Sequence, residues 1–152
     1  MADKRPVFAI NWAEVEALAQ GRHDNPHHIL GMHETVDGVY INAYIQGAEK
    51  VFAVCKNTKK RYELKSDRVT DFYSVKVPDR QSFIYYFEVE MADGSKKIIE
   101  DPYAFEPVID PIDISKFNDG IHYEIYEKLG AHLCMLDGVK GVLFAVWAPH
   151  AA

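Results

Sequence analysis

The sequence has little cysteine, fewer basic than acidic residues and no long apolar run. Its two cysteines lie far apart, Cys55 on a predicted strand and Cys134 in a predicted loop. Two unclustered cysteines are typical of reduced thiols, not of a disulfide framework or a metal site. Lys and Arg number 17 against 23 Asp and Glu, for a formal net charge of −6. This balance lacks the concentrated positive surface that a nucleic acid requires, so we expect no nucleic-acid partner.

Signals for membrane insertion and export are also missing. No apolar stretch reaches the length of a membrane span, and the opening residues MADKRPVFAINW lack the apolar core and cleavage site of an export signal. We therefore expect a cytoplasmic protein with no membrane partner. The 152 residues suit one core with extensions better than two complete domains.

Two stretches of the chain resemble each other. Residues 38–48, GVYINAYIQGA, are similar to residues 141–151, GVLFAVWAPHA, and Tyr44 matches Trp147. Both are apolar at every other position and are rich in β-branched and aromatic residues, as a half-buried strand is. An immunoglobulin-like sandwich has about 100 residues, so the repeat predicts one complete β-domain and the first strand of a second. Chance similarity between two short strands is the alternative.

The N-terminal segment carries helix signals. Asn11 is a candidate N-cap, Glu14 occupies the capping-box position and Gly21 follows as a left-handed stop. An apolar stripe between them predicts that this helix packs against the β-domain, with Trp12 holding it there. The stripe consists of Trp12, Val15, Leu18 and Ala19.

A second short helical turn is predicted after Asn25, with Pro26 in its first position and Gly31 at its end. His23 and His27 have the four-residue spacing of two metal ligands on one helix face. Pro26 begins a new turn between them and breaks that geometry. We therefore predict no metal site, and expect the HHILG turn to pack against the sandwich.

From residue 36 onward the pattern changes to a period of two. Short strands separated by polar turns, without alternating helices, predict a mainly β protein. The fold class is an immunoglobulin-like antiparallel β-sandwich with a short N-terminal helical extension. The first predicted strand begins at residue 38 and ends before a QGAE turn at 46–49, and the others are 50–56, 62–64, 72–77, 83–91 and 96–100.

The strand 83–91, FIYYFEVEM, has the clearest register. A shift by one residue would bury its glutamates, so its apolar row is predicted to face the core. The Asp93-Gly94 turn then predicts a hairpin. The inward row is Phe83, Tyr85, Phe87, Val89 and Met91, and the outward row is Ile84, Tyr86, Glu88 and Glu90.

The C-terminal third is less regular. Prolines 102, 107 and 111 predict extended surface chain over residues 101–119. Residues 123–129, YEIYEKL, predict a short helix, and residues 137–141 a turn. A strand cut off from its sheet has unpaired backbone groups. Residues 141–152 are therefore expected to fray, to dock on the edge of the first domain, or to pair between molecules.

Several segments, in this order, resemble the N-terminal region of bacterial 1,4-alpha-glucan (glycogen) branching enzymes. The likeness spans residues 26–151, and YEKLGAH at 126–132 followed by an AVWAP strand is its most specific part. The other similar segments are HHILGMH at 27–33, GVYINAYIQGAEKV at 38–51 and ADGSKKIIEDPYAF at 92–105.

The resemblance implies a role in glycogen biosynthesis. Such enzymes are glycosyltransferases that cut an α-1,4-glucan and reattach the piece through an α-1,6 bond, using two carboxylates of a barrel of the alpha-amylase superfamily. The resemblance implies that an immunoglobulin-like domain and a carbohydrate-binding module precede this barrel. The present chain corresponds to the first domain and the first strand of the second. No catalytic residue can be carried onto it, and no cofactor or metal is implied.

The chain's own carboxylates do not predict an active site. A glycosidase requires two carboxylates facing a sugar cleft, and nothing converges those present here on a pocket. A solvated strand face and ordinary loop acids explain them. The candidates were Glu88, Glu90, Asp101, Asp110 and Asp113.

Aromatic rings on outward faces are the candidate carbohydrate-binding residues. Tyr40, Tyr44 and Tyr86 each offer a flat face for stacking on glucose and a hydroxyl. Single exposed aromatics are also normal on protein surfaces, so a structural role is the alternative for each. Tyr44 could equally be a core or domain-seam residue.

Two functions of different classes follow. The leading hypothesis is a non-catalytic domain that positions α-glucan, glycogen or maltooligosaccharide, through weak contacts and sets the length of the transferred chain. The alternative is a structural or domain-interaction sandwich without glucan binding. A related debranching or trehalose-forming enzyme is a third hypothesis, which YEKLGAH disfavours.

The predicted domains are a helical extension (1–35), the sandwich with its extended segment (36–136), and a linker with the truncated second sandwich (137–152). Its partners would be the downstream carbohydrate-binding and barrel domains.

Overall fold

The computed structural model describes residues 10–67, 71–78 and 81–148. The chain divides into two compact units, Met1–Ala104 and Phe105–Ala152. None of the helices in the described ranges is long and apolar enough to cross a membrane.

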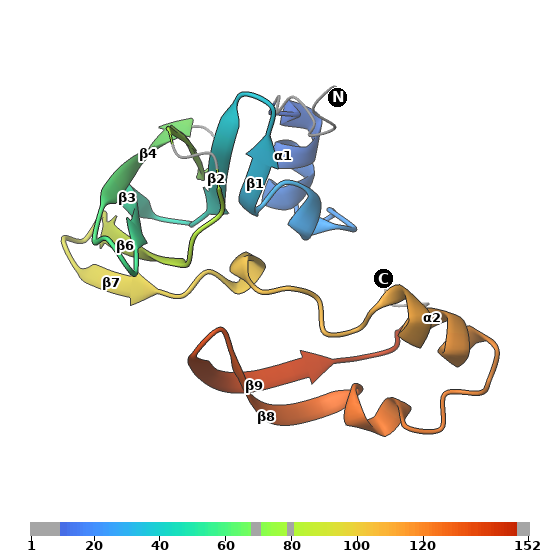
Figure 1. The fold of residues 1–152 in the computed structure, drawn as a ribbon. Helices are drawn as coiled ribbons and strands as arrows, with labels where there is room; N and C mark the ends of the chain where they lie inside the picture. Colours follow the sequence, from blue (N-terminus) through green and yellow to red (C-terminus); the bar gives the residue numbers. More distant parts are fainter. Residues whose placement is uncertain (1–9, 68–70, 79–80, 149–152) are drawn as a thin grey trace. The chain divides into compact units, whose positions relative to one another are not determined.

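The first unit is built on one curled antiparallel sheet of seven strands (Figure 1). Its order is β1-β2-β5-β4-β3-β6-β7, and β4 bonds to both β3 and β5, which joins the two layers of a sandwich. This confirms the predicted mainly β, sandwich-like class with a short N-terminal helix. The strands are β1 Gly31–Thr35, β2 Gly38–Tyr44, β3 Ala48–Cys55, β4 Arg61–Asp67, β5 Phe72–Val77, β6 Tyr85–Met91 and β7 Lys96–Ile99.

The inner core lies between the layers and follows the period of two. On β6 the side chains of Tyr85, Phe87 and Val89 are buried, whereas the alternate Tyr86 and the glutamates beside it are only half-buried. The predicted register of this strand is confirmed. β3 contributes Val51 and Ala53 opposite Val89 and Phe87, so the two strands share one apolar face.

A second apolar cluster lies under the N-terminal helix, α1 (Trp12–Ala19), and the 3₁₀ turn η1 (Pro26–His28). The Asn11 side chain accepts a hydrogen bond from Ala13 N at 3.1 Å, so the predicted N-cap is confirmed. Val15 is fully buried and anchors the helix over Phe72. Trp12, predicted to do this, is 50% exposed and contributes an edge contact to the Phe72 ring at 6.4 Å.

Strand β1 was missed from the sequence because GMHET lacks a regular apolar alternation. The segment pairs antiparallel with β2, from Gly31 opposite Asn42 to Thr35 opposite Gly38. Gly31 has a φ of +92° and begins the strand, although it was predicted to end the preceding turn.

The second unit corrects several predictions. Helix α2 (Pro111–Asn118) lies within the stretch predicted to be extended, since Pro111 occupies the first helical turn after the N-cap Asp110. Asp110 and Asp113 form a reciprocal capping box. The YEIYEKL segment contains only a 3₁₀ turn, η3 (Ile125–Glu127), and a further 3₁₀ turn, η2 (Pro102–Ala104), closes the first unit.

The C-terminal strand finds a local partner. β8 (Gly130–Leu136) pairs with β9 (Val139–Ala145) in a two-stranded hairpin. Cys134 lies on β8, so its predicted loop position was wrong. β8 was not predicted from the sequence. Because β8 pairs with β9, the described part of β9 has its backbone partner within the same chain and neither frays nor needs a second molecule for pairing. Residues 149–152, part of the same prediction, lie outside the described residues.

Candidate functional site

Tyr40 and Tyr44, two of the predicted sugar-contact residues, lie on β2 and are both engaged. Tyr40 donates a hydrogen bond to Asp37 Oδ2 at 2.9 Å, and Lys76 Nζ lies 5.6 Å from its ring centroid. Burial and the Asp37 carboxylate raise the pKa of Tyr40. The Tyr44 ring packs against the cluster beneath α1.

Tyr86 lies on β6, in the other layer of the sandwich. It stands opposite Val54, and its hydroxyl is 3.4 Å from Glu88 Oε1. The three tyrosines therefore do not form one continuous surface.

The carboxylates considered from the sequence do not face a common cleft. Glu88 pairs with Arg61 at 2.9 Å, and Glu90 pairs with Lys96 at 2.9 Å. Asp101 is buried and accepts a hydrogen bond from the Tyr85 hydroxyl, and burial raises the pKa of both groups. Glu88 and Glu90 lie half-buried on a strand face and form ion pairs there, in line with the predicted structural role. Asp101 was predicted to be an ordinary loop acid, and this was wrong because its carboxylate is buried.

In the second unit, Asp113 is the centre of a small polar network. Its carboxylate lies 2.8 Å from His122 Nε2 and 3.2 Å from Lys128 Nζ, and these contacts hold its pKa well below the usual range, led by the hydrogen bond from His122. The same carboxylate caps α2 through the Asp110 N–H at 3.1 Å. Its neighbours already use both oxygens, so it has a structural role.

An open groove of about 410 Å³ lies at one end of the sandwich. We call it the end groove. The rings of Tyr62 and Phe83 line it with their centroids 5.9 Å apart and their planes tilted by 35°. Exposed polar side chains surround them. The lining residues are Cys55, Thr58, Lys60, Tyr62, Gln81, Ser82 and Phe83.

The rim of the end groove is held in place. Ser82 donates to Glu34 Oε1 through both its backbone N–H at 2.7 Å and its hydroxyl at 2.6 Å. On the other side, the backbone N–H of Cys55 bonds to Lys60 O at 2.9 Å and tightens the turn between β3 and β4. An apolar floor with a few fixed polar groups is typical of small-molecule sites.

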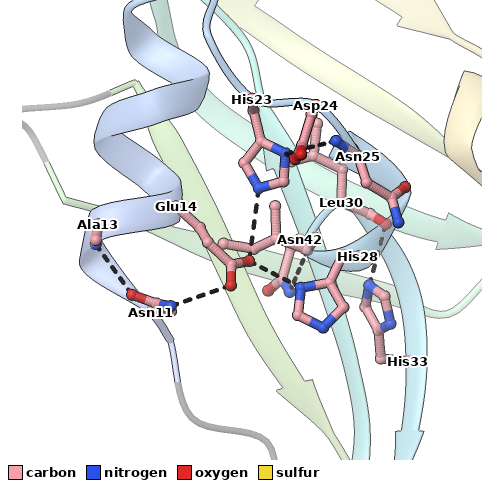
Figure 2. Close-up of polar contacts among 11 residues, drawn as sticks. Asn11, Ala13, Glu14, His23, Asp24, Asn25, His28, Leu30, His33 and Asn42 are labelled. Atoms are coloured by element: carbon pink, nitrogen blue, oxygen red, sulfur yellow. Dashed lines mark hydrogen bonds and ion pairs between the residues drawn. The ribbon is translucent and has the colours of Figure 1, made fainter.

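A second pocket, of about 420 Å³, lies against α1. We call it the helix pocket, and Figure 2 shows its polar side chains converging on Glu14. Glu14 Oε2 lies 2.9 Å from His28 Nδ1 and 3.5 Å from His23 Nε2, and Glu14 Oε1 accepts from Asn11 Nδ2 at 3.0 Å. The lining residues are Ala13, Glu14, Ala17, Arg22, His23, Asp24, Asn25 and His28.

The histidines of the helix pocket do not form a metal site. No group of three or more potential ligands suited to a metal ion occurs among the described residues. His27, whose spacing from His23 was considered and rejected as a ligand pair, lies edge-on against the Tyr103 ring with the centroids 4.9 Å apart. The hydrogen bond from His28 holds the pKa of Glu14 below its usual range, so the carboxylate is ionised at neutral pH.

Sequence reasoning missed both pockets. Tyr62 and Phe83 were read only as strand and core residues, and the turns that open a groove beside them have no regular pattern. Glu14 was read as a capping residue, and its side chain does contact the Asn11 side chain. Its contacts with His23 and His28 depend on the chain returning past α1, although the clustering of four histidines between residues 23 and 33 was a signal.

Taken together, the first unit is a β-sandwich-like domain with a helical cover and two open pockets, and its described residues have no converging catalytic carboxylates. Residues 11–103 match the family described as alpha-1,4-glucan branching enzyme GlgB, N-terminal domain. The chain belongs to this family.

Named relatives agree. The chain is 35% identical over 143 residues to the 1,4-alpha-glucan branching enzyme GlgB of Thermosynechococcus vestitus, covering 91% of this chain and 18% of the relative. It is 36% identical over 137 residues to that of Novosphingobium aromaticivorans, covering 90% and 19%. It is 35% identical over 152 residues to that of Agrobacterium fabrum, covering 99% and 20%. The chain thus spans about a fifth of these relatives.

Proposed function

We propose that this chain is the non-catalytic N-terminal part of a cytoplasmic glycogen branching enzyme, in which it positions α-glucan and influences the length of the transferred chain. The catalytic barrel and the carbohydrate-binding module would follow it. In this proposal residues 1–35 are the helical extension, residues 36–136 are the first sandwich with its extended C-terminal segment, and residues 137–152 open the second sandwich. Strand β1, within residues 1–35, also belongs to the sheet of the first sandwich.

The end groove is the observation that carries the proposal, given the family. Two adjacent rings, Tyr62 and Phe83, provide apolar faces for sugar stacking, and Lys60, Gln81 and Ser82 provide hydrogen-bonding groups at the rim. The groove is shallow and open, so contacts would be weak. Tyr40, Tyr44 and Tyr86 remain candidates for additional contacts, although the Tyr44 side chain packs against the apolar cluster beneath α1.

A maltohexaose titration of the ¹⁵N-labelled chain tests glucan binding. We expect amide shifts around residues 58–62 and 81–83. Tyr62→Leu keeps apolar volume but removes the stacking ring, and should weaken binding about three- to tenfold. Tyr40→Leu and Tyr86→Leu test the additional candidate contacts. Weaker binding in either variant shows that its ring contributes, and binding equal to the parent's confines the contact surface to the end groove.

A different outcome would favour the alternative function. If millimolar maltohexaose shifts no amide resonance, direct glucan contact is wrong and a structural or domain-interaction role remains. The hairpin β8–β9 favours that role, because one of its faces carries apolar side chains that are strongly exposed. These are Leu133 (90%), Met135 (58%), Val142 (47%) and Phe144 (74%). A following domain of the parent chain would cover them.

A further inference from the structure

We propose that the helix pocket is a second carbohydrate site that binds a vicinal diol of one glucosyl residue. Nε2 of His23 would donate to one hydroxyl, and the carboxylate of Glu14 would accept from that hydroxyl and its neighbour. The choice of a glucosyl ligand rests on the proposed function. The site itself rests on the positions of His23 and Glu14 in the helix pocket.

His23 presents a fixed donor to the pocket. Its side chain is 7% exposed, and its Nδ1 accepts a hydrogen bond from the backbone N–H of Asn25 at 3.1 Å. An imidazole nitrogen that accepts carries no proton, so the neutral ring has its proton on Nε2. Among the described residues, this Nε2 is buried and makes no well-formed hydrogen bond, although it lies 3.5 Å from Glu14 Oε2 and contributes to the lowered pKa of Glu14. A buried polar atom without a partner is rare in folded proteins and calls for an explanation.

Glu14 places an acceptor next to that donor. Its Oε2 lies 3.5 Å from His23 Nε2, too far for a good hydrogen bond, and His28 Nδ1 holds the same oxygen at 2.9 Å (Figure 2). Asn11 fixes the other oxygen at 3.0 Å. The carboxylate is therefore held from two sides while it faces the pocket.

A hydroxyl group fits this pair better than an ion does. A hydroxyl oxygen accepts from the His23 N–H while its hydrogen is donated to Glu14, so both groups are satisfied at once. An anion would lie against the ionised Glu14 carboxylate, and a cation would leave the His23 N–H without an acceptor. Adjacent hydroxyls let one ligand use both the carboxylate and the polar rim of Arg22 and Asn25. The described residues that line the pocket include no aromatic side chain other than the histidines, which suits the edge of one sugar ring rather than a stacked chain.

Imidazole NMR tests the site directly. With ¹⁵N-histidine labelling of the full chain, the spectrum should show His23 as the neutral Nε2–H tautomer. Added maltotriose should shift the His23 Nε2 and His28 resonances in a saturable way. An unchanged His23 signal at tens of millimolar maltotriose would overturn the proposal.

His23→Asn is the discriminating variant. The asparagine oxygen can replace Nδ1 as acceptor for the Asn25 N–H, while the Nε2 donor is removed. We expect the maltotriose-dependent shifts at His28 to weaken at least tenfold, with the remaining amide spectrum preserved. His27→Asn, on η1 and not among the residues that line the pocket, is the control and should bind normally. Equal binding by both variants would refute the site.

Glu14→Gln is a second variant that keeps the side-chain shape and removes the charge. It should reduce the same shifts while the Asn11 contact remains possible. Binding at the end groove is monitored separately, through the amide shifts of residues 58–62 and 81–83. If those signals respond and the histidine signals do not, the helix-pocket proposal fails and the proposed function stands. If neither responds, both fail.

Discussion

At the residue scale, Gly31 is a position where a side chain would cause both backbone strain and a steric clash. Its φ is +92°, and a Cβ built on it would lie 2.7 Å from the carbonyl oxygen of Tyr103. A side chain there meets both backbone strain and a backbone atom that cannot rotate away. We expect Gly31→Ala to lower the free energy of unfolding by about 2–4 kcal/mol, measured by urea denaturation.

Gly21→Ala is the control for this prediction. Gly21 also has a positive φ, +65°, but a Cβ there would meet nothing within 4 Å. Gly21→Ala should lower the free energy of unfolding only by the cost of a left-handed backbone conformation, about 1–2 kcal/mol. Equal losses in the two variants would show that the contact with Tyr103 has no energetic weight.

Individual residue roles were predictable where a local rule decides them. Asn11 caps α1 because its side chain needs only the next turn of helix, and the core row of β6 follows from alternation alone. The contacts of Glu14 were not predictable, because they join residues 9 and 14 positions apart across a reversal of the chain. Tyr44 shows the same limit. It lies on the face of β2 opposite the core row of Val39, Ile41 and Ala43, but its side chain packs against the apolar cluster beneath α1.

At the scale of elements, α1 should be attached in a pH-dependent manner. The hydrogen bond from His28 leads the contacts that lower the pKa of Glu14 in the folded state. A carboxyl with a lowered folded pKa contributes stability above its unfolded pKa, and this contribution is lost as pH falls through the folded value. We expect the stability difference between the parent and Glu14→Gln to be largest near neutral pH and to shrink below about pH 4.5.

Urea midpoints measured between pH 7 and 3 would check this. Glu16→Gln, on the same helix, is the matched substitution, and it should show a difference from the parent that changes less with pH. A Glu14→Gln difference that stays constant down to pH 3 would contradict the assigned contacts.

The predicted elements were correct where one rule dominates. Strands β2 to β7 follow from alternation and turn residues, and their boundaries moved by only a few positions. Helix α2 was missed because proline was read as a breaker, whereas Pro111 after Asp110 is a helix start. β1 and β8 were missed because a short strand without clear alternation forms only when its partner is present.

At the scale of the whole molecule, stability should be unevenly distributed. Both buried apolar clusters lie in the first unit, while among residues 105–148 no apolar side chain is buried. An isolated two-stranded hairpin is marginally stable in water. We expect amide hydrogen exchange to be at least 100-fold faster in β8 and β9 than in β3 and β6, measured on the full chain. Equal protection in the two units would contradict this.

Strand order was beyond sequence reasoning for a physical reason. The period of two tells which face of a strand is buried, but not which strand lies beside it. Here β4 bonds to β3 along one part of its length and to β5 along another, and that double pairing closes the curl. Such pairing depends on contacts between distant residues, which leave no local pattern.

The position of β7 at the end of the seven-strand order bears on how the protein behaves at high concentration. β7 has only four residues, and three of them, Lys96, Lys97 and Ile98, are exposed. A short rim with two positive charges is a poor template for a strand from another copy, because the added backbone would find few bonding positions and would bring like charges together. The β7 edge therefore disfavours strand pairing between two copies of the protein.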